Sequence, residues 1–203
     1  MSKWFKKIKF IILTMVIVAG IGAFSPMVVT ATEMKTEDNV SWEIQGTTLI
    51  ISGTGNMEDY EQINSLAVKL HDLHVLWRPD IFVHVDSIFS KEELQEIIDN
   101  KSMYIARVNN KVAGYILIGK IVEGTKKGYK YRKELPIDAM IVDEDMRGKG
   151  IGTKLLEHVI DLAEENNCTG IRLTVNEEND SARKLYEKVG MKLKNVAYNL
   201  HLE

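Results

Sequence analysis

The glycine-rich segment Arg147-Gly148-Lys149-Gly150-Ile151-Gly152 constrains the fold of this chain more than any other stretch of it. It lies between a predicted strand, residues 137–142, and a predicted helix that begins between Gly150 and Thr153. Such a turn points several backbone N–H groups in one direction, with the positive end of a helix behind them. Glycines let the backbone approach an anion without an intervening Cβ, and Arg147 and Lys149 add positive charge at the rim. The segment therefore predicts a pyrophosphate-binding turn.

The glycine spacing separates three kinds of phosphate-binding turn. The P-loop pattern G-x-x-x-x-G-K-[ST] does not occur, and the third glycine of a dinucleotide-binding G-x-G-x-x-G would fall on Thr153. The pattern [QR]-x-x-G-x-[GA] does occur, at Arg147, Gly150 and Gly152, and here the chain resembles the GNAT superfamily of acyl-CoA-dependent N-acyltransferases. The alternative is a turn whose charges are merely solvated. The resemblance implies that the coenzyme A pyrophosphate is held by Arg147, Gly148, Lys149, Gly150, Ile151, Gly152 and Thr153.

A second segment, residues 179–191, resembles the N-x-x-A-x-x-L-Y-x-x-x-G-[FM] motif of the same family. Asn179 or Asp180 is expected to cap a helix. The resemblance implies that Asn179, Ala182 and Tyr186 contact the coenzyme, and that Tyr186 protonates the departing CoA thiolate. A phenol is a donor at neutral pH and a thiolate is a sufficiently basic acceptor. The alternative reading makes Asn179 only a cap and Tyr186 an aromatic residue at the edge of the core.

The resemblance places the thioester of the donor against the strand before the turn. In the family a bulge in this strand leaves backbone N–H groups free, and one of them can stabilise the charge that develops on the thioester oxygen. Met140, Ile141 and Val142 occupy that place. Asp138 is a candidate base, directly or through a water, because a lysine-like amine with a pKa of about 10.4 must lose a proton. A purely structural carboxylate is an equal alternative for Asp138.

The N-terminus has the organisation of a targeting segment. A basic region with four lysines precedes an apolar run over residues 10–23, and Ala31 ends a small-residue site typical of cleavage. Residues 1–31 are therefore expected to form a signal peptide or, if they are not removed, a hydrophobic leader helix that anchors the chain in a membrane. The protein is then expected to be secreted or membrane-anchored, whereas the catalytic domain alone would be expected in the cytoplasm.

Residues 32–56 are expected to form a linker and a β-hairpin stub. Residues 42–55 resemble one hairpin from the β-rich modules of secreted bacterial leucine-rich-repeat surface proteins. A single hairpin has no core of its own, so the strand at 49–52 is expected to serve as the first strand of the following domain.

Residues 57–203 are expected to form one GNAT-type α/β domain with a mixed, mostly antiparallel central sheet flanked by helices. Ser90 and Glu93 form a predicted capping box. His71 and His74 lie in the region that lines the acceptor pocket of the family and are candidate substrate residues; packing on a half-buried helix face is the alternative. Helices are predicted over 57–77, 90–98, 153–166 and from 179, and strands over 103–108, 111–120, 137–142, 170–175 and 192–201.

Two classes of function fit these patterns. The first is an N-acetyltransferase that moves an acetyl group from acetyl-CoA to a primary amine of a small molecule or peptide, by direct attack in a ternary complex and without a metal. The second is an exported or membrane-anchored binding module on a non-catalytic scaffold, because exported proteins meet little acetyl-CoA. A net charge of −3 gives no argument for nucleic acid, and one cysteine, Cys168, excludes an internal disulfide. Membrane contact is expected only through the N-terminal segment, and a homodimer is left open.

Overall fold

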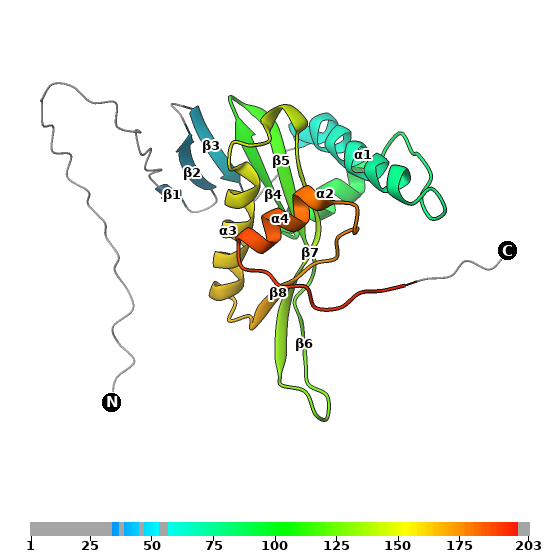
Figure 1. Cartoon of the computed structure of the whole chain (residues 1–203). Helices are drawn as coiled ribbons and strands as arrows, with labels where there is room; N and C mark the ends of the chain where they lie inside the picture. Colours follow the sequence, from blue (N-terminus) through cyan, green and yellow to red (C-terminus); the bar gives the residue numbers. More distant parts are fainter. Residues whose placement is uncertain (1–33, 37–38, 45–46, 53–56, 199–203) are drawn as a thin grey trace, which may run out of the picture.

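The computed structural model describes residues 34–36, 39–44, 47–52 and 57–198 (Figure 1). The predicted leader, residues 1–31, lies outside the described residues. A central sheet of eight strands is flanked by helices, as the sequence predicted for an α/β fold. The strands are β1 Met34–Thr36, β2 Asn39–Ile44, β3 Thr47–Ser52, β4 Met103–Val108, β5 Lys111–Ile118, β6 Val122–Gly124, β7 Arg132–Val142 and β8 Gly170–Arg172.

The sheet is mixed, and among the described strands only the β7–β8 pair is parallel. The hydrogen-bonded order is β1-β2-β3-β4-β5-β7-β6, and β8 also pairs with β7. β3 pairs with β4 from Leu49 opposite Val108 to Ser52 opposite Ile105. The strand at 49–52 therefore lies beside β4, where a first strand of the domain was expected. The hairpin that it forms with β2 has its turn, residues 45–46, outside the described residues.

Two helical layers cover the sheet (Figure 1). Helices α1 Tyr60–Trp77 and α2 Lys91–Asp99 pack on one face, and α3 Ile151–Glu165 and α4 Asp180–Lys188 lie on the other. Two short 3₁₀ turns, η1 Met57–Asp59 and η2 Glu144–Met146, precede α1 and α3. Among helices in the part of the chain that the structure describes, none combines the length and apolar character needed to cross a membrane.

Each layer buries its own cluster of apolar side chains against the sheet. On the α3 side, Leu155 and Val159 are fully buried against Ala106 and Ile116 of β4 and β5. On the α1 side the fully buried residues are Ile63, Leu94, Met103, Ile105 and Tyr115. This two-sided burial explains why β4 and β5 are apolar along nearly their whole length, instead of alternating between apolar and polar residues.

Local signals explain several element boundaries. The Ser90 side chain accepts from the Glu93 N–H, and the Glu93 carboxylate accepts from the Ser90 N–H, so the predicted capping box starts α2. Asn109 and Asn110 both adopt positive φ, of 51° and 61°, in the two-residue turn between β4 and β5. Asparagine tolerates that region well, which makes a tight turn between the two predicted strands possible.

Other predicted boundaries are wrong. The described part of the predicted final strand, residues 192–198, contains no strand and is exposed, and β8 ends at Arg172 instead of continuing to 175. The two errors have one cause, because a strand needs a partner and β8 runs beside β7 for only three residues. Conversely, β7 begins at Arg132, five residues earlier than predicted, since it also pairs with β6, a strand that the sequence analysis missed.

Candidate active site

β7 carries a bulge at Asp138. Leu117 of β5 lies opposite Ala139, but the next residue, Ile118, lies opposite Ile137, so Asp138 is an extra residue in β7. The bulge changes which side chains face which layer: Ile137 packs in the α3-side cluster, whereas Ala139 packs in the α1-side cluster. The bulge was expected at residues 140–142, but it lies before them, at the residue predicted to be the base.

The carboxylate of Asp138 lies against Gly119, directly after β5. A Cβ at Gly119 would stand 2.7 Å from Asp138 Oδ2 and 3.0 Å from Pro136 Cγ, so any side chain there would force the carboxylate to move. The Gly119 N–H donates to the Pro136 carbonyl at 3.0 Å. Asp138 itself is exposed, and within the described residues its carboxylate has no hydrogen-bond or ion-pair partner. It is thus held at the bulge by shape, with its oxygens open to solvent, as a general base or a water-holding carboxylate requires.

The parallel strands β7 and β8 stop pairing directly before the bulge at Asp138. β8 pairs with Glu134, Leu135 and Pro136 of β7 and with nothing beyond, while β5 pairs with β7 as far as Val142. Consequently no described strand pairs with the second edge of β7 from Ile137 to Val142. Backbone N–H groups of a strand point alternately to its two edges, so some of those in Met140, Ile141 and Val142 face this open edge. A chain of polar groups such as a thioester-bearing arm can bind there in place of a strand.

The glycine turn, residues 147–152, lies where β7 passes into α3. Gly148 and Gly150 have φ of 76° and 80°, and no atom lies within 4 Å of a Cβ built on either residue. Gly150 caps α3 without any side-chain hydrogen bond, so the first N–H groups of the helix, at Ile151, Gly152 and Thr153, have no side-chain cap. The side chain of Ile151 is 2% exposed and anchors this end of the helix in the core. The turn therefore offers open backbone donors at the positive end of a 15-residue helix.

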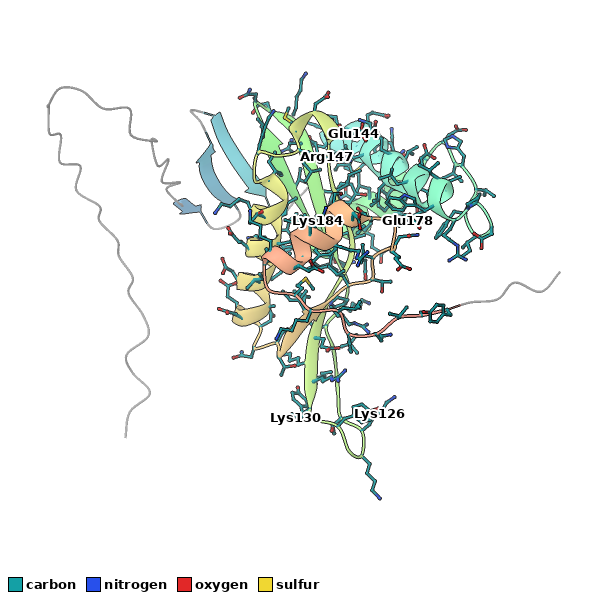
Figure 2. The ribbon with its side chains drawn as sticks, viewed as in Figure 1. Lys126, Lys130, Glu144, Arg147, Glu178 and Lys184 are labelled. Carbon is teal, nitrogen blue, oxygen red and sulfur yellow. The ribbon has the colours of Figure 1, made fainter. Side chains whose placement is uncertain are left out.

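The two basic side chains of the glycine turn, Arg147 and Lys149, hydrogen-bond to carbonyl groups of residues that precede it. The Arg147 Nε donates to the Val142 carbonyl at 3.2 Å, and its guanidinium lies 3.6 Å from Glu144 (Figure 2). The Lys149 ammonium donates to the Asp145 carbonyl at 3.1 Å. Both residues are exposed, so their side chains can turn toward an anion at little cost.

α4 carries two further residues of the predicted coenzyme site, Asn179 as its cap and Tyr186 in its second half. The Asn179 side-chain oxygen accepts from the Ala182 N–H at 3.2 Å, which confirms the predicted cap and leaves its amide NH₂ free to donate elsewhere. Tyr186 packs against the α3-side core, and burial raises the pKa of its hydroxyl. Within the described residues that hydroxyl has no hydrogen-bond partner. A half-buried, protonated phenol without a partner is suited to donate a proton to a bound molecule.

Gly152 shows how these parts meet. A Cβ at this position would stand 2.9 Å from Leu185 of α4, 3.2 Å from Met140 and 3.7 Å from Val142 of β7. Side chains of β7, the start of α3 and the helix that carries Tyr186 therefore meet at a single glycine. Of the residues that the sequence singled out, the structure brings Gly152 together with Met140 and Val142.

His71 and His74 lie elsewhere, under the loop that follows α1. The His71 Nε2 lies 2.7 Å from the Val83 carbonyl oxygen, and both histidine rings pack on Phe82 with centroids 5.9 and 5.3 Å away. Burial, and secondarily the charge of His71, lower the pKa of His74. Both side chains hold the loop against α1, and their contact with an acceptor stays a prediction.

Gly114 and Gly119 were not among the predicted site residues. A Cβ at Gly114 would stand 2.5 Å from the Ile141 carbonyl oxygen, so β5 approaches β7 closely beside the Val142 end of the open stretch. Both glycines interrupt or follow an otherwise apolar strand pattern, and an isolated glycine in a strand is a signal of close backbone approach. Within the described residues, His, Cys, Asp and Glu side chains do not gather in threes around a position that could hold a metal ion.

Comparisons with known proteins agree with this architecture. Residues 70–191 match the family described as "Acetyltransferase (GNAT) family", and the chain belongs to that family. The solved structure of a mutant of the BH1408 protein from Bacillus halodurans superimposes with a TM-score of 0.68 at 26% identity, covering 75% of this chain and 99% of that one. An aminoglycoside acetyltransferase from an uncultured soil metagenomic sample superimposes with a TM-score of 0.54 at 19% identity, covering 76% and 97%, and shares the fold.

Curated relatives match over shorter stretches. Peptidyl-lysine N-acetyltransferase YjaB of Salmonella typhimurium is 42% identical over 57 residues, which are 28% of this chain and 36% of YjaB. Streptothricin acetyltransferase A of Bacillus subtilis is 25% identical over 135 residues, 66% of this chain and 78% of that protein. The chain thus spans about a third of the length of YjaB. The family to which the chain belongs consists of acetyltransferases that use acetyl-CoA as cosubstrate.

Proposed function

We propose that this protein transfers the acetyl group of acetyl-CoA to a primary amine of a small molecule or peptide, by direct attack while both substrates are bound. The observation that carries the proposal is the meeting at Gly152 of three parts: β7, whose second edge is open, an uncapped helix start and the helix of Tyr186. Thioester, phosphate and leaving thiolate each need one of these three parts.

The glycine turn would hold the pyrophosphate. The N–H groups of Ile151, Gly152 and Thr153 face the anion with the helix dipole behind them, and Arg147 and Lys149 add charge. Asn179 and Ala182, at the start of α4, would contact the coenzyme beside it. The pantetheine arm and thioester would then lie along the open edge of β7, where an N–H of Met140, Ile141 or Val142 can hydrogen-bond the thioester oxygen.

The chemistry proceeds by addition and elimination. The amine nitrogen attacks the thioester carbon, the C–N bond forms, and negative charge develops on the carbonyl oxygen. The tetrahedral intermediate collapses with cleavage of the C–S bond, and Tyr186 gives its hydroxyl proton to the thiolate, because burial keeps the pKa of Tyr186 above the neutral range. Asp138, directly or through a water, takes the proton that the amine loses. No metal takes part in the proposed reaction.

The class of the acceptor amine is proposed from the names of the relatives. YjaB is named for peptidyl-lysine and the Bacillus subtilis relative for streptothricin, so both a peptide and a small molecule are reasonable amines. His71 and His74, with the loop that they hold, are proposed to border the acceptor. A panel of lysine peptides, streptothricin, aminoglycosides and polyamines should therefore be screened for release of CoA, detected as free thiol.

The screen also tests the alternative of a non-catalytic binding module. Release of CoA that requires one amine and is lost in Asp138→Asn supports the enzyme, with the Asn substitution keeping the shape beside Gly119. If calorimetry shows binding of acetyl-CoA but no amine in the panel produces free thiol or an acetylated product, the protein is a binding module and the enzymatic proposal is wrong.

Export is proposed separately, on the sequence of residues 1–31 alone. These residues fused to alkaline phosphatase, which is active only outside the bacterial cytoplasm, should give activity in cells. The same fusion with Lys3, Lys6, Lys7 and Lys9 replaced by glutamate is the control for orientation. A phosphatase that stays inactive and soluble with the natural leader contradicts a secreted or anchored location.

A further inference from the structure

A basic arm projects from the body of the protein, away from both helical layers (Figure 1). We define it as residues 120–133, which comprise β6, the first residues of β7 and the turn between them. Every residue from 122 to 132 is exposed. Lys126 and Lys130 lie at its tip, beyond the rest of the molecule (Figure 2). A flat surface that approaches the protein from that side would contact the tip of the arm first.

The arm concentrates positive charge in an otherwise acidic chain. It contains the acid Glu123 and six bases. The whole chain has a net charge of −3, so the arm carries +5 and all other residues together −8. The bases are Lys120, Lys126, Lys127, Lys130, Arg132 and Lys133.

The charges at the tip have no partner within the described residues. Glu123 accepts from the Tyr131 hydroxyl at 3.0 Å, and the Lys133 ammonium, at the base of the arm, donates to the Asn166 carbonyl at 2.8 Å. By contrast, the ammonium groups of Lys126, Lys127 and Lys130 make no hydrogen bond or ion pair there. Keeping three like charges within five residues disfavours the folded hairpin, so the cluster is not explained by stability.

Exposed aromatic and apolar side chains accompany the lysines. Tyr129 is 63% exposed, Tyr131 54% and Val122 48%. The Tyr129 ring also lies 5.9 Å from the Arg132 guanidinium. Lysine and tyrosine side chains are both apolar along the stem and polar at the end, which suits the boundary between lipid headgroups and hydrocarbon.

We propose that the basic arm binds an anionic lipid surface, with the ammonium groups of Lys126, Lys127 and Lys130 on headgroup phosphates and Tyr129 at the headgroup level. The contact is additional to any made by the N-terminal segment and does not depend on acetyl transfer. It would hold the domain at a fixed orientation, with the glycine turn at the end of the domain away from the lipid (Figure 1).

Geometry favours a flat lipid surface over a nucleic acid. From Val122 to Lys126 an extended chain rises by roughly 13 Å at about 3.3 Å per residue. This exceeds the screening length of about 8 Å at physiological ionic strength, so the tip can touch anionic lipid while the acidic body stays outside its field. A nucleic acid needs a basic stripe along several phosphates, whereas basic charge here is confined to the arm and the remaining residues carry −8.

The test is co-sedimentation of the full-length protein with phosphatidylcholine vesicles, prepared with and without phosphatidylglycerol. Each lysine near an anionic membrane contributes about fivefold to binding, so Lys126→Gln/Lys127→Gln/Lys130→Gln should bind the anionic vesicles roughly 100-fold more weakly. Binding to vesicles of phosphatidylcholine alone should be the same for both proteins. Added salt should weaken the wild type and leave the variant little changed.

Two matched variants complete the design. Lys111→Gln/Lys188→Gln/Lys192→Gln removes three exposed lysines outside the arm and should keep nearly wild-type binding. Lys126→Arg/Lys127→Arg/Lys130→Arg keeps the charge and should bind as the wild type does. All four proteins contain residues 1–31, so any contribution of that segment cancels. Equal losses in the two glutamine variants would overturn the proposal, as would tighter binding of single-stranded RNA than of anionic vesicles through the same three lysines.

Discussion

The two halves of the candidate site are built in opposite ways. The coenzyme side, formed by the open edge of β7, the glycine turn and α4, presents backbone groups and keeps side chains away; Gly148 and Gly150 have no atom within 4 Å of a built Cβ. The proposed acceptor side, formed by α1 and the loop 78–89, is closed by side-chain contacts. Its buried Asn64 donates to Ser87 and accepts from the backbone of Ile88 and Phe89.

This difference follows from what each side binds. A pyrophosphate is the same in every acetyl-CoA enzyme and is met by backbone N–H groups, which every residue but proline supplies. The requirement on the sequence is therefore the absence of side chains at fixed positions. An acceptor differs between enzymes, so its side needs particular side chains, and here they pair residues 12 to 25 positions apart.

The largest effect is expected from adding a side chain to the coenzyme side. Gly150→Glu fills the open turn, strains a residue with φ of 80° and places a carboxylate where the pyrophosphate binds. Affinity for acetyl-CoA, measured by calorimetry, should fall by roughly 100-fold or more. Gly128→Glu is the control, since Gly128 has a similar φ of 86°, equally open surroundings and a place in a turn far from α3 (Figure 1). Equal affinities in the two variants would remove the glycine turn from coenzyme binding.

Tyr186→Phe should separate chemistry from coenzyme binding. The ring packs in the α3-side core and stays, so affinity for acetyl-CoA should change little. The turnover rate should fall by about 10²–10⁴, the range for loss of a positioned general acid. Because burial raises the pKa of Tyr186, the wild-type rate should show no loss of this acid from pH 7 to 9. A variant with an unchanged rate, under conditions where chemistry is rate-limiting, would make water the proton donor.

Gly119→Ala tests whether the bulge positions Asp138. The added Cβ would stand 2.7 Å from Asp138 Oδ2, so the carboxylate must move, and turnover should fall roughly 10- to 100-fold. Gly124→Ala is the control, because nothing lies within 4 Å of its built Cβ. In an Asp138→Asn background, Gly119→Ala should have almost no further effect on turnover. Additive losses would show that Gly119 acts by some route other than Asp138.

Some features of the candidate site could be predicted from the sequence and others could not. The order of Arg147, Gly150 and Gly152 predicted the turn, and Asn179 predicted the start of α4, because each of these roles is set by neighbours in the chain. The position of the bulge could not be derived in this way. It depends on how β5 and β7 are aligned, and Gly119 lies 19 residues from Asp138, so only the fold brings them together.

The same limit explains the errors at strand ends. Residues 170–175 and 192–201 have sequences typical of strands, but strand pairing depends on a neighbour that no local pattern specifies. For β8 the neighbour is β7, and the pairing between them ends at Pro136. The missed strand β6 shows the converse case, because its three residues are exposed and only Val122 is typical of a strand, yet they pair with β7.

The smallest predicted effect lies on the acceptor side and depends on pH. His84 Nδ1 lies 2.7 Å from Asp72 Oδ1, which ties the loop to α1, and the hydrogen bond to Asp72, with Asp86 adding to it, raises the pKa of His84. A raised pKa means that the pair stabilises the closed loop fully below the ordinary histidine pKa of about 6.5, and that this contribution is lost as pH rises through the higher folded value.

Protection of the amides of residues 81–86 in hydrogen exchange, corrected for intrinsic rates, should therefore fall a few-fold above that range, as expected for an exposed pair. Asp72→Asn should lower the protection at low pH and reduce its pH dependence to the smaller contribution of Asp86. Asp80→Asn, which alters the Arg78–Asp80 pair in the same loop, should lower protection equally at both pH values. A loop whose protection is independent of pH in the wild type would show that His84 does not close the acceptor side, and the contrast with the coenzyme side would then rest on Asn64 and His71.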